Sequence, residues 1–264
     1  MTICQEPAKS PPVLAAGGRL HLVYQPRVDL RTGQVRGVEA LLRRRRSDGS
    51  QQMPDDFIPA AERSGAIVDI GAWVLQQAVR QASAWHRRGR TIHVSINVSP
   101  LQIDHGTLLP LVRRALEHSG LPPGAIELEV TETCGVRMPG RARVTMAQLR
   151  RLGVNLALDD FGKGYAGVPT LHWLPATTIK IDKGLVDALR RRGPARRLAA
   201  AVIAFARSLG AECVAEGVET VDQLSALRRL GCDLAQGFLF SPAVECNRVP
   251  ANYRLDGPFP LEIS

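Results

Sequence analysis

The sequence predicts an α/β fold in which strands and helices alternate to form a barrel, and three observations support this prediction. The chain has 264 residues, which is enough for one barrel domain with a sizeable core. Eight strand-like apolar runs alternate with helical segments along most of it. Polar side chains recur at the ends of these runs, and function collects at the carboxyl ends of the strands in barrels of this type.

Composition sets the expected boundaries of the domain. Residues 1–18 are small, polar and proline-rich, so we expect a poorly ordered tail. Residues 19–264 are expected to form a single barrel domain with a C-terminal extension. With 45% hydrophobic and 22% charged residues, the chain has the profile of a globular enzyme rather than of a disordered protein.

The elements follow from short apolar runs and from longer segments with helical periodicity. The expected strands are Leu20–Tyr24, Val35–Ala40, His93–Asn97, Ile126–Val130, Asn155–Asp159, Thr178–Ile181, Glu212–Ala215 and Leu234–Leu239. The expected helices are Phe57–Arg63, Ile70–Arg88, Leu108–Ser119, Arg143–Leu152, Ala195–Leu209 and Val221–Leu230. Gly153 and Gly231 follow two of these helices, as C-terminal caps commonly do. No G-x-G-x-x-G motif opens a helix after a strand, so a dinucleotide oxidoreductase is not predicted.

Charge and composition exclude several partners. The net charge of +9 favours an anionic partner, although a compositional bias towards arginine explains it equally well. Aromatic residues do not interleave with the arginine runs 43–46 and 190–192, so no nucleic-acid polymer is expected. No apolar run approaches the roughly 20 residues of a membrane span, and we find no signal peptide. Five scattered cysteines without a CxxC pair indicate neither a zinc site nor a disulfide framework, so we expect a cytoplasmic protein.

Two adjacent carboxylates, Asp159 and Asp160, close one of the apolar runs. Side chains alternate faces along a strand, so neighbouring carboxylates diverge unless the chain bends or a cation holds both. Like charges this close also resist being ionised together. A pair of divalent cations about 3.5–4 Å apart meets both difficulties, because one aspartate can bridge them and its neighbour can bind the second. A solvated turn is the alternative, and it is the commoner explanation of a lone Asp-Asp pair.

Other polar residues at strand ends favour the metal site over the turn. A carboxylate, amide or amine occurs in or directly after seven of the eight runs: Glu39, Asn97, Glu129 with Glu132, Asp159 with Asp160, Lys180, Glu216 with Glu219, and Gln236. Helix capping explains any one of them but not their recurrence. The candidate ligands are oxygen donors without histidine or cysteine, so Mg²⁺ or Mn²⁺ is expected rather than zinc. Two-metal hydrolysis of a phosphodiester fits this set.

With these motifs in order, the chain resembles the EAL domain family of cyclic di-GMP phosphodiesterases. The signature triplet is Glu39-Ala40-Leu41, and the resemblance runs from about Leu20 to Pro242. The other matching motifs are Tyr24-Gln25-Pro26, Phe57-Ile58-Pro59-Ala60-Ala61-Glu62, Asn97-Val98-Ser99-Pro100, Glu129-Val130-Thr131-Glu132-Thr133, Asp159-Asp160-Phe161-Gly162, Lys180-Ile181-Asp182, Glu216-Gly217-Val218-Glu219-Thr220 and Gln236-Gly237-Phe238. The resemblance implies a TIM-like (βα)8 barrel whose first strand is antiparallel to the others.

The resemblance also implies a role for each residue. Two ions, Mg²⁺ or Mn²⁺, would be held at one position by Glu39, Asn97, Glu129 and Asp159, and at the other by Asp159, Asp160 and Glu216. Lys180 would contact the attacking water, so the expected catalytic residues are Lys180, Glu39, Asp159 and Asp160. Gln25 and Arg43 would contact the substrate, and Gln236 would contact it or orient the site. Glu132 and Glu219 would contact the ligand residues rather than the ions, and Glu132 would steady the loop after Asp160.

The chain departs from the family pattern in the loop after Asp160. Lys163 stands where the family has threonine, and Ala166 and Gly167 stand where it has two serines, so we expect looser coupling between metal, substrate and dimer contacts. Two functions therefore stay open. The first is a phosphodiesterase that opens cyclic di-GMP to linear pGpG, and the second is a weak or inactive cyclic di-GMP receptor or protein-interaction module. A homodimer is a candidate assembly, and the absence of a Gly-Gly-Asp-Glu-Phe motif predicts a stand-alone domain.

Overall fold

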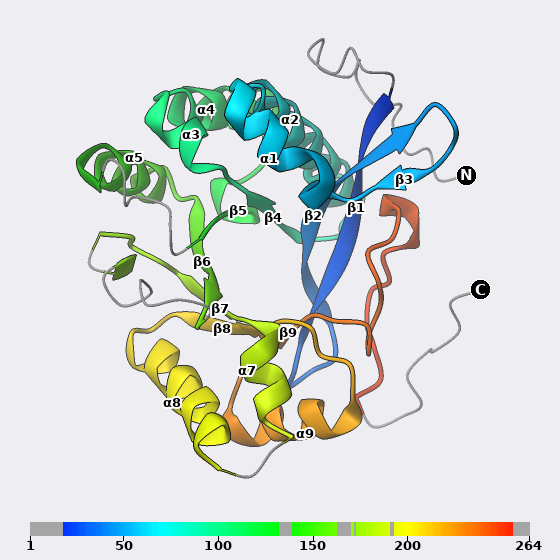
Figure 1. Cartoon of the computed structure of the whole chain (residues 1–264), viewed down its shortest axis with the longest axis vertical. Coiled ribbons are helices and arrows are strands. Elements are labelled where there is room, and N and C mark those ends of the chain that lie inside the picture. Colours follow the sequence, from blue (N-terminus) through cyan, green and yellow to red (C-terminus); the bar gives the residue numbers. More distant parts are fainter. Residues whose placement is uncertain (1–17, 132–138, 163–169, 172, 191–192, 256–264) are drawn as a thin grey trace.

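Eight strands close into a barrel (Figure 1). The computed structural model describes residues 18–131, 139–162, 170, 171, 173–190 and 193–255. The barrel closes because β1 pairs with both β9 and β2, while the short β3 only extends the end of β2. The strands are β1 (Gly18–Asp29), β2 (Val35–Arg46), β3 (Gln51–Gln52), β4 (His93–Asn97), β5 (Ile126–Thr131), β6 (Asn155–Phe161), β7 (Thr178–Ile181), β8 (Glu212–Ala215) and β9 (Leu234–Ala235).

Strand β1 runs antiparallel to both of its neighbours, whereas the other barrel strands run parallel to one another. A tight turn makes this possible, because it joins β1 to β2 without a helix. In the turn, Asp29 Oδ1 accepts hydrogen bonds from the backbone N–H groups of Arg31 and Thr32 at 2.9 and 2.8 Å. Gly33 adopts a φ of 75°, which glycine reaches without strain. The prediction of a TIM-like barrel with an antiparallel first strand is confirmed.

Helices surround the barrel (Figure 1). They are α1 (Pro54–Ser64), α2 (Ile67–His86), α3 (Pro100–Asp104), α4 (Leu108–Ser119), α5 (Pro139–Arg151), α7 (Lys183–Ala188), α8 (Pro194–Ser208) and α9 (Val221–Leu230), with short 3₁₀ turns η1 (Pro123–Ala125) and η2 (Cys246–Arg248). In α2 the buried residues Ile70, Val74 and Ala78 recur every fourth position, which gives the helix one apolar face towards the sheet. Local sequence signals define both ends of α9. Thr220 caps its first turn, and Gly231 follows its last residue with a φ of 75°.

The C-terminal segment packs beside the β1–β2 hairpin (Figure 1). The backbone N–H of Tyr24 donates to Val244 O at 2.7 Å, and Gln34 forms an isolated bridge with Asn252. The Tyr24 ring meets Trp85 of α2 edge to face, with ring centroids 5.1 Å apart. Strand β1 is therefore packed both by α2 and by the C-terminal segment.

Most predicted elements are present, and the differences have physical causes. Strands β4, β7 and β8 and helices α4 and α9 have the predicted bounds. Strands β1 and β2 are longer than predicted because they pair with each other from Gly18↔Arg46 to Val28↔Val35. Helices α3 and α7 were not predicted, because five or six residues give no periodicity to detect. Strand β1 begins at Gly18, one residue inside the range expected for the tail.

Two further expectations concern cysteines and membranes. Cys213 and Cys232 are free and buried. Within the described ranges, no helix combines the length and apolar character that a membrane span requires.

Candidate metal centre and active site

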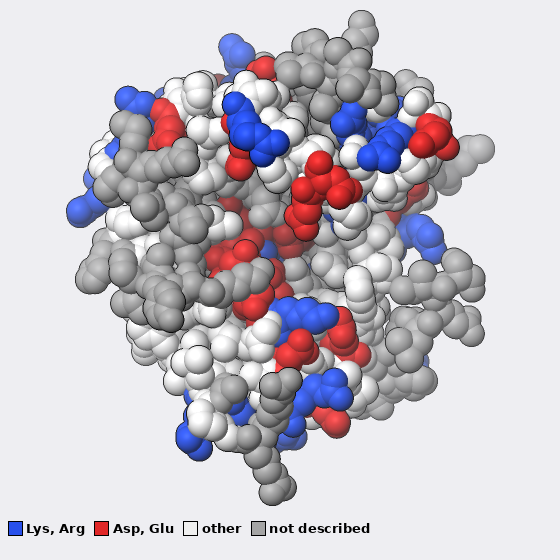
Figure 2. All heavy atoms as spheres, in the orientation of Figure 1, with Lys and Arg blue, Asp and Glu red and all other residues white. Residues whose placement is uncertain are grey.

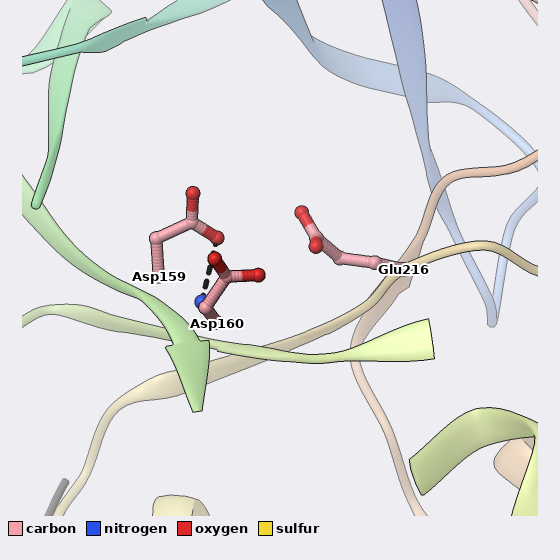
Figure 3. Close-up of side chains that lie close together, drawn as sticks. All are labelled: Asp159, Asp160 and Glu216. Atoms are coloured by element: carbon pink, nitrogen blue, oxygen red, sulfur yellow. Dashed lines mark hydrogen bonds between the residues drawn. The ribbon is translucent and has the colours of Figure 1, made fainter. Parts of the chain in front are cut away.

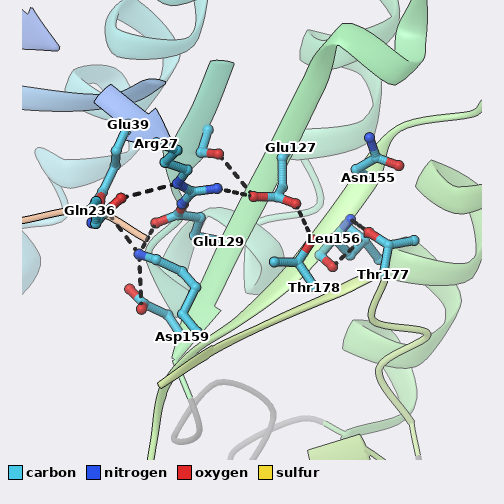
Figure 4. Close-up of polar contacts among 12 residues, drawn as sticks. Arg27, Glu39, Glu127, Glu129, Asn155, Leu156, Asp159, Thr177, Thr178 and Gln236 are labelled. Atoms are coloured by element: carbon cyan, nitrogen blue, oxygen red, sulfur yellow. Dashed lines mark hydrogen bonds and ion pairs between the residues drawn. The ribbon is translucent and has the colours of Figure 1, made fainter. Parts of the chain in front are cut away.

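Alternation along three parallel strands places two layers of polar side chains inside the barrel. The inward-pointing residues come in pairs two positions apart: Ser95 and Asn97 on β4, Glu127 and Glu129 on β5, and Thr178 and Lys180 on β7. Residues two apart share a face of the strand, and the interior side chains of such barrels stack in layers. Figure 4 shows Glu127 with Thr178 in one layer and Glu129 near Asp159 in the other. The second layer lies nearer the carboxyl ends of the strands, where we expected the site.

A bend at the end of β6 brings the adjacent carboxylates of Asp159 and Asp160 to one side. The pairing of β6 with β7 shifts register between Leu158 and Phe161, as at a β-bulge. Asp160 has a φ of 58°, the only positive φ of a non-glycine residue in the described part of the chain. Its backbone N–H donates to Asp159 Oδ1 at 2.8 Å (Figure 3). Ligand oxygens of Asp159, Asp160 and Glu216 lie within 4.8 Å of one another.

The ammonium group of Lys180 lies in the middle of the carboxylates. Its Nζ is 2.6 Å from Glu129 Oε2, 2.7 Å from Glu216 Oε1, 3.0 Å from Asp159 Oδ1 and 3.5 Å from Glu39 Oε2. Burial acts to lower the pKa of Lys180, but the four carboxylates outweigh it and raise the pKa well above its ordinary value. Lys180 is therefore a fixed positive charge inside the acidic cluster.

Glu39 is held as a carboxylate by several donors. Asn97 Nδ2 donates to its Oε1 at 2.8 Å, and Gln236 Nε2 donates to its Oε2 at 2.7 Å. Burial acts to raise the pKa of Glu39, but the charges of Lys180 and Arg27 outweigh it and lower the pKa to about 2. Glu39 is consequently ionised at neutral pH.

Glu129 and Glu216 show the opposite behaviour. Burial, followed by the like charge of Glu39, raises the pKa of Glu129 well above its ordinary value. Burial also raises the pKa of Glu216 to about 7, because the charges of Asp159 and Glu39 add to it and Lys180 only partly opposes it. With all of its carboxylates ionised, the cluster would hold more negative charge than its two buried cations balance, so additional positive charge would favour the ionised form.

The donors in this cluster fit hard divalent cations. The predicted ligands offer only carboxylate and amide oxygens, which Mg²⁺ and Mn²⁺ prefer: Glu39, Asn97, Glu129, Asp159, Asp160 and Glu216. The amide nitrogen of Asn97 already donates to Glu39, so its carbonyl oxygen is the atom that can bind a cation. The excess negative charge and the oxygen donors both match the metal site that the sequence predicts.

The predicted substrate contacts lie on β1 and β2 beside this cluster. Gln25 pairs with Glu39 across the two strands, and its Nε2 donates to Ser241 O at 3.2 Å. Arg43 is 9% exposed, and its Nη1 donates to Leu42 O at 2.8 Å. Burial lowers the pKa of Arg43, and nearby carboxylates oppose this only in part. Both side chains border the site, and their contact with substrate stays a prediction.

The remaining predicted residues divide into three groups. Gln236 is buried, and its Nε2 donates to Glu39 Oε2 and, at 3.2 Å, to Glu216 Oε1, as a residue that orients ligands would. Glu219 forms an ion pair with Lys183, and both side chains are exposed. Glu132 and the loop positions Lys163, Ala166 and Gly167 lie outside the described residues.

Sequence reasoning missed Arg27 and Glu127, which underlie the acidic cluster. Arg27 donates to Glu127, Glu129 and Gln236, and it is 3% exposed (Figure 4). Glu127 also accepts hydrogen bonds from Ser95 Oγ at 2.9 Å and from the Thr178 hydroxyl. One signal was available, because Glu127 lies two positions before Glu129 and so shares the same face of the strand.

The cluster lies beneath a hollow in the face of the molecule shown in Figure 2. Asp and Glu side chains gather in this hollow, and basic residues lie mostly around the edge of the same face. The net charge of +9 therefore coexists with a local acidic centre that attracts cations.

Comparison with known proteins identifies the class of this barrel. The family model of the EAL domain matches residues 13–243, so the chain belongs to the EAL domain family. The family resemblance predicted from the motifs is confirmed.

Several relatives show what such domains do elsewhere. The bifunctional diguanylate cyclase/cyclic di-GMP phosphodiesterase MucR of Pseudomonas aeruginosa is 39% identical over 89% of this chain and 34% of its own length. The cyclic di-GMP phosphodiesterase NbdA of the same species is 37% identical over 92% of this chain and 32% of its own length. This chain spans about a third of the length of such curated relatives.

Solved structures agree with the sequence comparison. The PaMucR phosphodiesterase in complex with c-di-GMP has a TM-score of 0.82 and 40% identity, covering 87% of this chain and 93% of that one. The EAL domain of Mycobacterium smegmatis DcpA has a TM-score of 0.73 and 37% identity, covering 87% of this chain and 95% of that one.

Proposed function

We propose that this chain hydrolyses cyclic di-GMP to linear pGpG with two divalent cations, Mg²⁺ or Mn²⁺. The observation that carries the proposal is the convergence of Asp159, Asp160 and Glu216 beside the ammonium of Lys180. The relatives named as cyclic di-GMP phosphodiesterases and the solved complex with c-di-GMP support the choice of substrate.

The residues that would hold the cations form two overlapping sets. One cation would be held by Glu39, Asn97, Glu129 and Asp159, and the other by Asp159, Asp160 and Glu216. The chemistry that such cations supply is activation of water as a nucleophile and neutralisation of charge on the phosphoryl group.

The reaction consumes one water and breaks one phosphodiester bond. The water oxygen forms a bond to phosphorus, the bond between phosphorus and the ribose O3′ breaks, and the product carries a 5′-phosphate and a free 3′-hydroxyl. Lys180 lies among the ligand carboxylates and would orient and polarise the attacking water. Gln236 keeps Glu39 and Glu216 in place, and Gln25 and Arg43 would hold the dinucleotide at the border of the site.

Product analysis tests this proposal directly. Purified protein with cyclic di-GMP and Mn²⁺ should give pGpG by liquid chromatography, and chelation by EDTA should stop the reaction. Asp159→Asn and Glu39→Ala should abolish turnover while the far-ultraviolet circular dichroism stays that of wild type, because each removes a ligand charge and leaves the apolar core intact. Asp69→Asn, at an exposed position of α2, is the matched control. Full turnover in either ligand variant would refute the assignment.

The receptor alternative has its support in the loop sequence at Lys163, Ala166 and Gly167. Binding of cyclic di-GMP without formation of pGpG, at saturating Mn²⁺, would establish it. Replacing both positions, Ala166→Ser with Gly167→Ser, should raise turnover if the missing hydroxyls limit the enzyme. The complete ligand set favours the enzyme. A homodimer is proposed on the family resemblance, and a cytoplasmic location on the scattered cysteines without a CxxC pair. Light scattering of the purified protein tests the former.

A further inference from the structure

Arg27 lies at the floor of the acidic cluster and makes three different contacts. From β1 its Nε donates to Gln236 Oε1 at 3.1 Å, and its Nη1 donates to Glu127 Oε1 at 2.5 Å. Its Nη2 donates to Glu129 Oε1, and Figure 4 shows the guanidinium between these partners. A planar guanidinium offers donors in a fixed fork, so the positions of the three acceptors are coupled.

The first consequence concerns the two oxygens of Glu129. Arg27 engages Oε1, whereas Oε2 faces Lys180 Nζ at 2.6 Å and thus the remaining carboxylates. Glu129 is less than 1% exposed at its side chain, so it has no room to exchange these oxygens freely. Arg27 therefore leaves Glu129 a single oxygen to present to the proposed cation site.

The second consequence concerns the amide of Gln236. A guanidinium nitrogen can only donate, so the Gln236 atom that faces Arg27 must be the carbonyl oxygen. The amide nitrogen then points at Glu39 Oε2 and Glu216 Oε1, which it contacts at 2.7 and 3.2 Å. The reversed amide would place a donor against Arg27 and an oxygen against two carboxylates, which is unfavourable at both ends.

We propose that Arg27 is a positioning residue for the proposed two-cation site. It fixes Glu129 as a ligand with one oxygen and fixes the amide of Gln236 as a donor to Glu39 and Glu216. This inference rests on the proposed function, because it concerns the same ligands. A simpler role competes with it: Arg27 also neutralises Glu127, which is buried, is not among the proposed ligands and accepts from two hydroxyls.

A set of four variants separates the positioning role from the neutralising role. Arg27→Met removes both, and it is expected to lower the melting temperature because two buried carboxylates lose a partner. Arg27→Met with Glu127→Gln removes the charge that needs neutralising, so it should recover most of the melting temperature. Arg27→Lys keeps the positive charge but loses the planar arrangement of guanidinium donors. Arg36→Met is the matched control, because Arg36 lies on neighbouring β2 and pairs instead with Glu212 at 2.8 Å.

The deciding measurement is Mn²⁺ affinity by isothermal titration, since it does not depend on turnover. If Arg27 positions the ligands, the Arg27→Met/Glu127→Gln and Arg27→Lys variants bind Mn²⁺ about tenfold or more weakly, as expected when a group behind the ligands is lost. Their kcat should fall more than their KM changes, while the control keeps wild-type values. Wild-type Mn²⁺ affinity in both variants overturns the proposal and leaves Arg27 the neutralising role.

The same titration distinguishes failure of this inference from failure of the proposed function. Wild-type protein that binds Mn²⁺ but forms no pGpG would refute hydrolysis, and the affinities of the variants would still decide the role of Arg27. Wild-type protein that binds no Mn²⁺ would overturn both.

Discussion

Lys180 has different electrostatic effects in the metal-free protein and in the protein with the proposed cations bound. Without cations, one ammonium contacts four carboxylates and offsets part of their repulsion. When two divalent cations are bound, the same ammonium becomes a like charge beside them. The residue should therefore stabilise the metal-free fold, weaken cation binding and orient the attacking water in the reaction.

These effects have opposite signs and can be separated in Lys180→Met. In EDTA the variant should unfold more easily by about 3–5 kcal/mol, because removing one partner leaves the buried carboxylates uncompensated. Saturating Mn²⁺ should return most of this stability. Mn²⁺ affinity should equal or exceed that of wild type, whereas turnover should fall by about 10²–10⁴-fold. Denaturant titration, calorimetric titration and product assays measure the three quantities, and loss of Mn²⁺ binding would show that Lys180 supports the ligands instead.

Glu216 makes the stability of the metal-free protein depend on pH. Its folded-state pKa is about 7, above the ordinary 4.5, so between these values the folded state binds more protons than the unfolded state. Its contribution to stability is therefore highest below pH 4.5 and falls as the pH rises through about 7. In EDTA, Glu216→Gln should gain stability relative to wild type between pH 5 and pH 8. Thermal melts along the pH range test this, with Glu117→Gln on the exposed side of α4 as control. A difference that does not change with pH would contradict the prediction.

At the scale of elements, the end of β6 is the feature that makes the site. A regular strand would send Asp159 and Asp160 to opposite faces. The register shift and the φ of 58° at Asp160 turn the second carboxylate towards Glu216 (Figure 3). Gly162 follows with a φ of 103° and lies against Leu185 of α7. The bend therefore rests on a glycine whose backbone lies close to Leu185 of α7.

Gly162→Ala tests this support. A side chain there meets an unfavourable φ, at a cost of about 1–2 kcal/mol, and its Cβ collides with Leu185 Cδ1, at a cost of about 1–3 kcal/mol more. Gly65→Ala is the matched control, because Gly65 has a φ of 78° and no atom within 4 Å of an added Cβ. The Gly162 variant should lose more stability than the control and also bind Mn²⁺ more weakly. Equal loss in both variants, with Mn²⁺ affinity unchanged, would mean that the bend does not depend on this contact.

The same bend shows how far sequence reasoning reaches. The strands and the oxygen ligands could be predicted from the sequence, because each ligand occurs in or directly after a strand-like run and the runs alternate with helical segments. The sequence shows that a regular strand would point Asp159 and Asp160 in opposite directions. It does not show the bulge and the positive φ that bring them together, because these depend on tertiary contacts. Arg27 was missed for a related reason, since its three partners come from β5 and from the residue after β9, and only the closed barrel brings them together.

At the scale of the whole molecule, the site draws its proposed ligands from most of the strands of the barrel. The proposed ligands come from five places around it: Glu39 on β2, Asn97 on β4, Glu129 on β5, Asp159 and Asp160 on β6, and Glu216 directly after β8. The interior of the barrel at the carboxyl ends of the strands is polar and rich in buried carboxyl groups. Cations bound there would join strands that are far apart in sequence.

We therefore expect Mn²⁺ to stabilise the barrel as a whole. A ligand that binds only the folded state at 100 times its Kd adds about 2.7 kcal/mol to the free energy of unfolding. Because the ligands span strands β2 to β8, hydrogen exchange should slow on all of these strands, including β7, which carries no proposed ligand but pairs with β6 and β8. Asp159→Asn should lose the stabilisation, whereas Asp69→Asn should keep it. Protection confined to the end of β6 would mean that the cation binds only the Asp159 and Asp160 pair, and the two-cation assignment across the barrel would be wrong.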